Sequence, residues 1–100
     1  MPVKTEYRDD ILTARLQGEI DHHTAAAMRE TIDRTAEGCL PSRLVLDFSD
    51  VSFMDSSGIG LVMGRYRLIR SMGGELTITG TSPRIQAMMK MAGLDQLTKY

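Results

Sequence analysis

A short apolar run in the middle of the chain, residues 44–48 (Leu-Val-Leu-Asp-Phe), constrains the fold more than any other segment. Its length and apolar character predict a central strand that is covered on both faces. Beyond it, apolar side chains recur at the i, i+3, i+4, i+7 spacing of a helix that packs on a sheet: Ile59, Val62, Met63, Tyr66 and Ile69. A strand followed by such a helix indicates an α/β protein.

Turn and cap residues divide the N-terminal half into further elements. A turn at residues 9–10 separates an extended N-terminal piece from an alternating strand over residues 11–17, which predicts a hairpin. Asp21 is expected to cap a helix that continues to about Glu37 and ends at Gly38.

The C-terminal half continues the alternation of strands and helices. The central helix is expected to stop at residues 73–74 (Gly-Gly), and residues 76–79 alternate as another strand. Ser82 and Pro83 then begin a helix that Gly93 closes, and the last residues begin an edge strand. The order β-β-α-β-α-β-α-β predicts a single α/β domain with a mixed sheet, parallel after its hairpin and covered mainly by helices.

Composition limits the classes of function. With 100 residues, 42% of them hydrophobic, the chain can bury one core, so we expect one domain over residues 1–100. The 12 basic and 13 acidic residues give a net charge of -1, which favours neither nucleic acid nor an anionic membrane surface. We find no secretory signal and no run near the ~20 apolar residues of a membrane span. We therefore expect a cytoplasmic monomer with no nucleic-acid or membrane partner.

The sharp turn over residues 55–60 (Asp-Ser-Ser-Gly-Ile-Gly) is the strongest candidate for a functional site. Its first three side chains can cap a helix, and its glycines leave backbone N–H groups open to an anion or a partner. A phosphate on a serine here adds about -1.5 to -2 charges, which a helix N-terminus stabilises by about 0.3 to 1 kcal/mol. A partner already docked on the turn has to accommodate that charge, so we expect phosphorylation to release the partner. Ordinary capping also explains the turn, and close helix packing also explains Gly60 and Gly64.

Enzymatic functions lack their motifs in this chain. Met54 and Asp55 stand two positions before the serines, where a hydrolase elbow needs glycine, and both histidines precede the serines. No Lys-Ser or Lys-Thr follows the glycines, which excludes a P-loop. Cys39 and two adjacent histidines provide no metal-ligand set, so we expect no catalytic residue, metal or cofactor. A small nucleotide-binding or weakly hydrolysing module stays an alternative, because a helix start attracts phosphate.

Three segments resemble a known family. Residues 18–24 (Gly-Glu-Ile-Asp-His-His-Thr), 53–60 (Phe-Met-Asp-Ser-Ser-Gly-Ile-Gly) and 64–66 (Gly-Arg-Tyr) are similar to STAS-domain anti-sigma-factor antagonists, above all those of the sporulation sigma-F pathway in Bacillus-type bacteria. The resemblance implies that the free antagonist binds an anti-sigma factor, which is also a serine kinase, and so frees the sigma factor. It also implies that the kinase phosphorylates the first serine of the turn and that the antagonist then dissociates, until a PP2C-type phosphatase removes the phosphate. Stress-response antagonists carry similar turns, so the sigma pathway stays open.

The resemblance also assigns residues. By motif position, Ser56 is the phosphoacceptor and Ser57 the neighbouring cap residue, a choice that the physics of the turn alone does not make. The other positions that it implies for partner binding are Asp21, His22, Thr24, Asp55, Gly58, Gly60, Leu61, Gly64 and Arg65. Leu61, Gly64 and Arg65 are expected to lie off the core face of their helix, although packing on a neighbouring helix also explains Leu61. Family members usually continue into another helix, so we expect the domain here to end before it.

Overall fold

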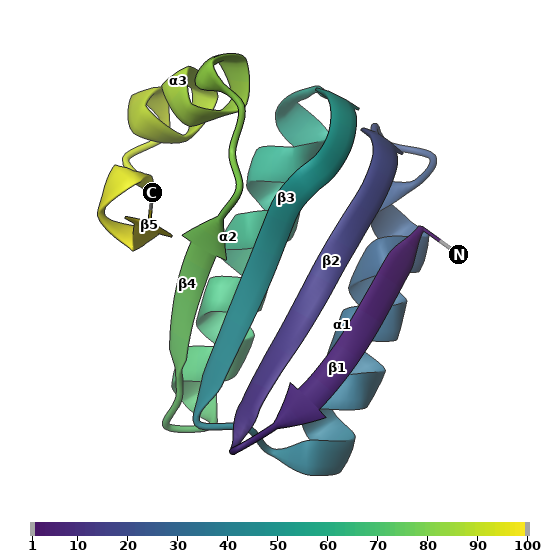
Figure 1. Cartoon of the computed structure of the whole chain (residues 1–100), viewed down its shortest axis with the longest axis vertical. Coiled ribbons are helices and arrows are strands. Elements are labelled where there is room, and N and C mark those ends of the chain that lie inside the picture. Colours follow the sequence, from purple (N-terminus) through teal and green to yellow (C-terminus); the bar gives the residue numbers. More distant parts are fainter. Residues whose placement is uncertain (1, 100) are drawn as a thin grey trace.

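The computed structural model describes residues 2–99 and contains one sheet, three α-helices and a 3₁₀ turn (Figure 1). In chain order the elements are β1 (Val3–Arg8), β2 (Ile11–Ile20), α1 (Ala25–Cys39), β3 (Arg43–Met54), α2 (Ser56–Ser71), β4 (Glu75–Thr79), α3 (Pro83–Met91), η1 (Asp95–Leu97) and β5 (Thr98–Lys99). The predicted order of elements is confirmed, including the short final strand; Tyr100 lies outside the described residues. Among residues 2–99, no helix has the length and apolar character needed to span a bilayer.

The five strands form one mixed sheet in the order β1-β2-β3-β4-β5. β1 and β2 are antiparallel, whereas β2, β3, β4 and β5 run parallel to their neighbours. The hairpin turns at Asp9 and Asp10, whose φ angles of 53° and 67° are the positive values that a tight two-residue hairpin turn requires. The predicted sheet, parallel after its hairpin, is therefore confirmed.

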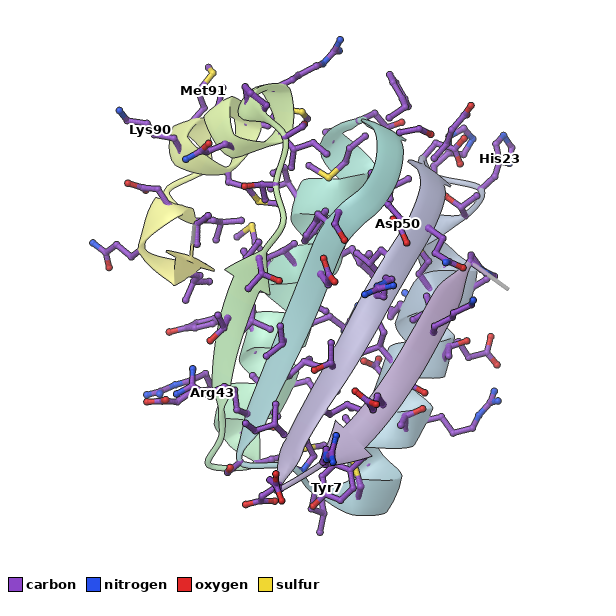
Figure 2. The ribbon with its side chains drawn as sticks, in the orientation of Figure 1. Tyr7, His23, Arg43, Asp50, Lys90 and Met91 are labelled. Carbon is purple, nitrogen blue, oxygen red and sulfur yellow. The ribbon has the colours of Figure 1, made fainter. Side chains whose placement is uncertain are left out.

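Within residues 2–99, the sheet carries helices on one face only. α1 and α2 lie behind it in Figure 1, and the opposite face presents side chains such as Arg43, labelled in Figure 2. In β3, Leu44, Leu46 and Phe48 are at most 1% exposed, whereas the alternate residue Asp47 is only half-buried. The expectation that this strand is covered on both faces is wrong, because its side chains alternate between the core and a solvent-facing surface.

α1 begins and ends later than the sequence predicts. It starts at Ala25, because Asp21 stabilises a turn that precedes the helix instead of capping the helix itself. It continues through Gly38 to Cys39. The chain leaves the helix at Leu40, which adopts the left-handed conformation (φ 47°) that glycine usually supplies at this position.

α2 packs on α1 as well as on the sheet, and this widens its buried face. Val62 is buried as predicted, but Leu61 and Arg65 are also only 4% and 7% exposed. Met63 and Tyr66, predicted to face the core, are each 38% exposed. The prediction was wrong at Met63, Tyr66 and Arg65 because periodicity identifies an apolar stripe but not the side on which the neighbouring helix lies. The burial of Leu61 agrees with the alternative that it packs on a neighbouring helix.

The caps of α3 follow the sequence prediction. The Ser82 Oγ accepts a hydrogen bond from the Ile85 N–H at 3.3 Å, and Pro83 is the first residue of the helix. Gly93 follows the helix with a φ of 77°, which favours glycine. Ile85 and Met89 are buried in the core, so this short helix covers the end of the sheet beside β4.

Candidate functional site

The carboxyl ends of β2 and β3 bring two loops together at one edge of the sheet, the upper edge in Figure 1. Both strands are longer than predicted, and their last residues, Ile20 and Met54, are paired. The Asp55 N–H donates to the Ile20 carbonyl at 3.1 Å, which ties the start of the second loop to the end of the first. The Asp-His-His segment and the Asp-Ser-Ser-Gly turn therefore lie side by side.

The second loop presents Ser56 at the N-terminus of α2. Asp55 is the cap residue: its Oδ1 accepts from the Ser57 N–H at 2.8 Å, and its carbonyl accepts from the Gly58 N–H at 3.0 Å. Ser57 is thus a helical residue, and its prediction as a cap is wrong, because the extended backbone that a cap needs belongs to Asp55. Ser56 is the first residue of the helix and is exposed, so an enzyme can reach it from solvent.

The first loop is held in shape by Asp21 and Thr24. The Asp21 Oδ1 accepts from the N–H groups of His23 (2.8 Å) and Thr24 (3.0 Å). The Thr24 hydroxyl accepts from the Asp21 N–H at 3.0 Å and donates to the Glu19 carbonyl at 2.8 Å. The hydrogen bond from the Thr24 amide lowers the pKa of the Asp21 carboxyl, although partial burial opposes it. Both side chains are engaged within the loop, and Figure 2 shows His23 directed into solvent.

A groove of about 400 Å³ lies between α1 and α2 beside these loops. The residues predicted for partner binding that line it are His22, Ser57, Gly60, Leu61, Gly64 and Arg65. The sequence pattern did not single out three further lining residues, Ala25, Ala26 and Arg29. They stand three, four and seven positions after His22, and this helical spacing is the sequence signal that could have identified them. The other predicted residues, Asp21, Thr24, Asp55 and Gly58, build the loops and the helix start and do not line the groove.

The glycines of α2 differ in what surrounds them. A Cβ added at Gly58 would clash with the Cγ and Sδ atoms of the buried Met54 side chain, which would have to move. A Cβ added at Gly60 or Gly64 would meet no atom within 4 Å among residues 2–99. Close helix packing is therefore the wrong explanation for this pair, and no internal contact offsets the helix propensity lost there. The space in front of both glycines belongs to the groove, where a partner can approach the backbone.

Alanine substitutions at Gly64 and Gly58 should change stability in opposite directions. Gly64→Ala places a methyl group in open space and should raise the free energy of unfolding by up to about 1 kcal/mol. Gly58→Ala forces Met54, which is 2% exposed, to move, and should lower it by about 1 to 3 kcal/mol. Urea unfolding followed by circular dichroism measures both. A loss of stability in Gly64→Ala would show that the space is already filled.

A partly buried ion pair links α1 and α2 below the groove. The Arg65 Nε lies 2.7 Å from the Asp33 Oδ1, and the two side chains are 8% and 28% exposed. Neither atom makes an aligned hydrogen bond within residues 2–99, so the contact is electrostatic. Burial lowers the pKa of Arg65 and raises that of Asp33, and in each case the attraction of the partner only partly opposes the shift. Arg65 therefore belongs to the helix interface as well as to the groove, and its prediction as a residue off the core face is wrong.

The pattern of one known family, the STAS domain, matches residues 2–99. The chain belongs to the STAS domain family. Among the relatives of this STAS domain, the anti-sigma F factor antagonist of Paenibacillus polymyxa is 35% identical over 94 residues, which are 94% of this chain and 80% of the relative. The anti-sigma-B factor antagonist of Bacillus subtilis strain 168 is 30% identical over 95 residues, which are 95% of this chain and 85% of the relative.

Solved structures agree with the fold of this STAS domain. The anti-sigma factor antagonist SpoIIAA in its unphosphorylated form has a TM-score of 0.86 and 30% sequence identity, over 97% of this chain and 85% of that chain. Phosphorylated SpoIIAA from Bacillus has a TM-score of 0.79 at 30% identity, over 97% of this chain and 88% of that chain. The family and the α/β fold that the sequence resemblance implies are confirmed, and these relatives are anti-sigma factor antagonists.

Proposed function

We propose that this STAS domain is an anti-sigma factor antagonist, a cytoplasmic regulator and not an enzyme. Its unphosphorylated form binds an anti-sigma factor that is also a serine kinase, and the sigma factor is set free. The kinase transfers the γ-phosphoryl group of ATP to the Ser56 Oγ: the new O–P bond forms, ADP leaves, and the hydroxyl proton passes to a base of the kinase. The phosphorylated antagonist is released, and a PP2C-type phosphatase hydrolyses the phosphate. The exposed position of Ser56 at the start of α2, beside an open groove, carries this proposal.

The charges around Ser56 favour a switch in binding over a change of fold. A phosphate at the first residue of a helix lies at the positive end of the helix dipole, which stabilises it by about 0.3 to 1 kcal/mol. Asp21 and Asp55 already place two carboxylates in the adjoining loops. A phosphate adds about -1.5 to -2 charges to them, and a docked partner would have to neutralise or desolvate the whole cluster. The scaffold therefore tolerates the modification that a docked partner does not.

The choice of sigma pathway rests on the relatives. They include antagonists of both an anti-sigma F factor and an anti-sigma-B factor, and the identity is higher to the sigma F protein. We therefore favour a sporulation pathway of the sigma F type over a stress-response pathway of the sigma B type. Binding assays against the two cognate anti-sigma factors distinguish them.

Release of the sigma factor tests the proposal. The unphosphorylated chain should displace the sigma factor from its complex with the cognate anti-sigma factor, as followed by size-exclusion chromatography. The chain phosphorylated by the same kinase should leave that complex intact. Displacement by neither form would refute the proposal. Hydrolysis of ATP or GTP by the isolated chain would instead favour a nucleotide-hydrolysing module.

A further inference from the structure

The α1–α2 groove carries positive charge that the chain does not neutralise. Arg29 and Arg65 both line it, together with His22. Within residues 2–99, Asp33 is the carboxylate paired with Arg65, and Arg29 forms no ion pair. Glu37 stands one turn beyond Asp33 on α1 and does not line the groove. Two guanidinium groups therefore face the groove against one carboxylate.

Arg65 has hydrogen-bonding capacity left over. The residue is only 7% exposed, and its Nε lies against the Asp33 carboxylate at 2.7 Å, so its terminal nitrogens are the donors left for a ligand. One terminal nitrogen donates to the Leu61 carbonyl at 3.4 Å, near the limit of a hydrogen bond. A guanidinium has five N–H donors in a planar fork that matches a carboxylate. A buried arginine with unused donors beside an open groove indicates a ligand of opposite charge.

The walls of the groove admit a side chain from outside. Gly60 and Gly64 form one wall and Ala25 and Ala26 the other, so both helices present small residues there. The space in front of the two glycines is empty among the described residues. An Asp or Glu side chain of a partner could therefore pass between the helices and reach the guanidinium groups.

We propose that the groove receives a carboxylate side chain, Asp or Glu, of the anti-sigma factor. That carboxylate completes a cluster of two guanidinium groups and two carboxylates with Arg29, Arg65 and Asp33. The inference rests on the function proposed above and adds the chemistry of the contact. A neutral partner would cover the groove and leave one guanidinium without a counter-charge, which costs affinity. An acidic partner gains charge-assisted hydrogen bonds that docking shields from solvent.

Two matched arginine substitutions on α1 test the proposal. Arg29→Gln removes one charge at the groove. Arg34→Gln removes the same charge outside it, where Arg34 pairs with Glu30 at 3.0 Å in an exposed contact. Both residues are exposed, so folding is preserved, which circular dichroism verifies. Isothermal titration calorimetry should show that unphosphorylated Arg29→Gln binds the anti-sigma factor about tenfold more weakly than unphosphorylated wild type does. Arg34→Gln should stay within about twofold of wild type.

Charge reversal identifies the partner residue. Arg29→Glu should bind weakly, and substitution of one acidic residue of the anti-sigma factor by lysine should restore its affinity. Equal affinities of Arg29→Gln and Arg34→Gln would overturn the groove inference, while phosphorylation-dependent binding by wild type would leave the proposed function standing. Failure of the wild type to bind the anti-sigma factor would refute both the groove inference and the proposed function. The groove inference would also be overturned if isolated Arg29→Gln lost ATP binding but bound the nucleotide-free anti-sigma factor as tightly as wild type does. The groove would then be a phosphate site.

Discussion

Ser56→Ala will accept no phosphate from the anti-sigma factor kinase, whereas Ser57→Ala will still accept one. Ser56 is exposed at the first position of α2, while Ser57 is half-buried and its N–H is held by the Asp55 carboxylate. Intact-mass spectrometry with excess kinase and ATP measures both variants at the end point. A phosphate on Ser56→Ala that is absent from Ser57→Ala would move the phosphoacceptor to Ser57.

Binding to the kinase should rank the forms of Ser56 by their charge. Ser56→Ala should keep the affinity of the unphosphorylated chain, because the substitution removes only an exposed hydroxyl. The phosphorylated chain should bind about a hundredfold more weakly, since an uncompensated charge in an interface costs about 3 kcal/mol. Ser56→Asp should lie between them, because one carboxylate carries less charge than a phosphate. Equal affinities of all three forms would contradict a release switch.

Most elements could be predicted because their signals are local. The hairpin turn at Asp9 and Asp10 and the Ser82-Pro83 helix start depend on residues within a few positions of each other. Asp21 shows where local signals are ambiguous. Its carboxylate bonds to the amides of His23 and Thr24, as a cap would, yet α1 begins only after them. The same side-chain chemistry serves a turn and a helix cap, so the boundary could not be placed from the sequence.

The groove was harder to predict because it depends on contacts between distant segments. The motif at the start of α2 predicted Ser56 as the phosphoacceptor, but the charge of the groove comes from α1 as well. Arg29 and Asp33 have the spacing of a pair within one helix, and only the packing of α1 on α2 turns Asp33 to Arg65. Likewise, the sequence could not distinguish Gly58, which packs against Met54, from Gly64, which faces open space.

Asp33→Ala should lower the free energy of unfolding by about 1 to 3 kcal/mol, because it removes the oxygen atoms beside the buried Arg65 Nε and leaves that N–H group with no polar partner. This loss of stability is smaller than the roughly 3 to 5 kcal/mol expected when a fully buried pair is broken, because Asp33 keeps some contact with solvent. Glu30→Ala is the matched control on the same helix. It removes an exposed pair with Arg34 and should cost less than about 1 kcal/mol. Urea unfolding measures both, and equal losses would contradict the role of burial.

The double variant Asp33→Leu with Arg65→Met separates the cost of an unpaired charge from the worth of the pair. It should recover most of the stability lost in Asp33→Ala, because apolar side chains of similar size replace both charges. A double variant as unstable as Asp33→Ala would mean that the ion pair itself holds α1 against α2.

The pH dependence of stability gives a second test of the burial of Asp33. Burial raises the pKa of this carboxyl above its ordinary value of 3.8, so the folded state holds the proton more tightly than the unfolded state. Its contribution therefore favours the folded state at low pH and is lost as the pH rises through the folded-state pKa. Asp33→Asn lacks this titration, so its free energy of unfolding should rise relative to that of wild type as the pH increases from below 3.8 through the folded-state pKa of Asp33. A difference that stays constant over this range would show that Asp33 titrates as it does in the unfolded chain, and that its attraction to Arg65 balances its desolvation.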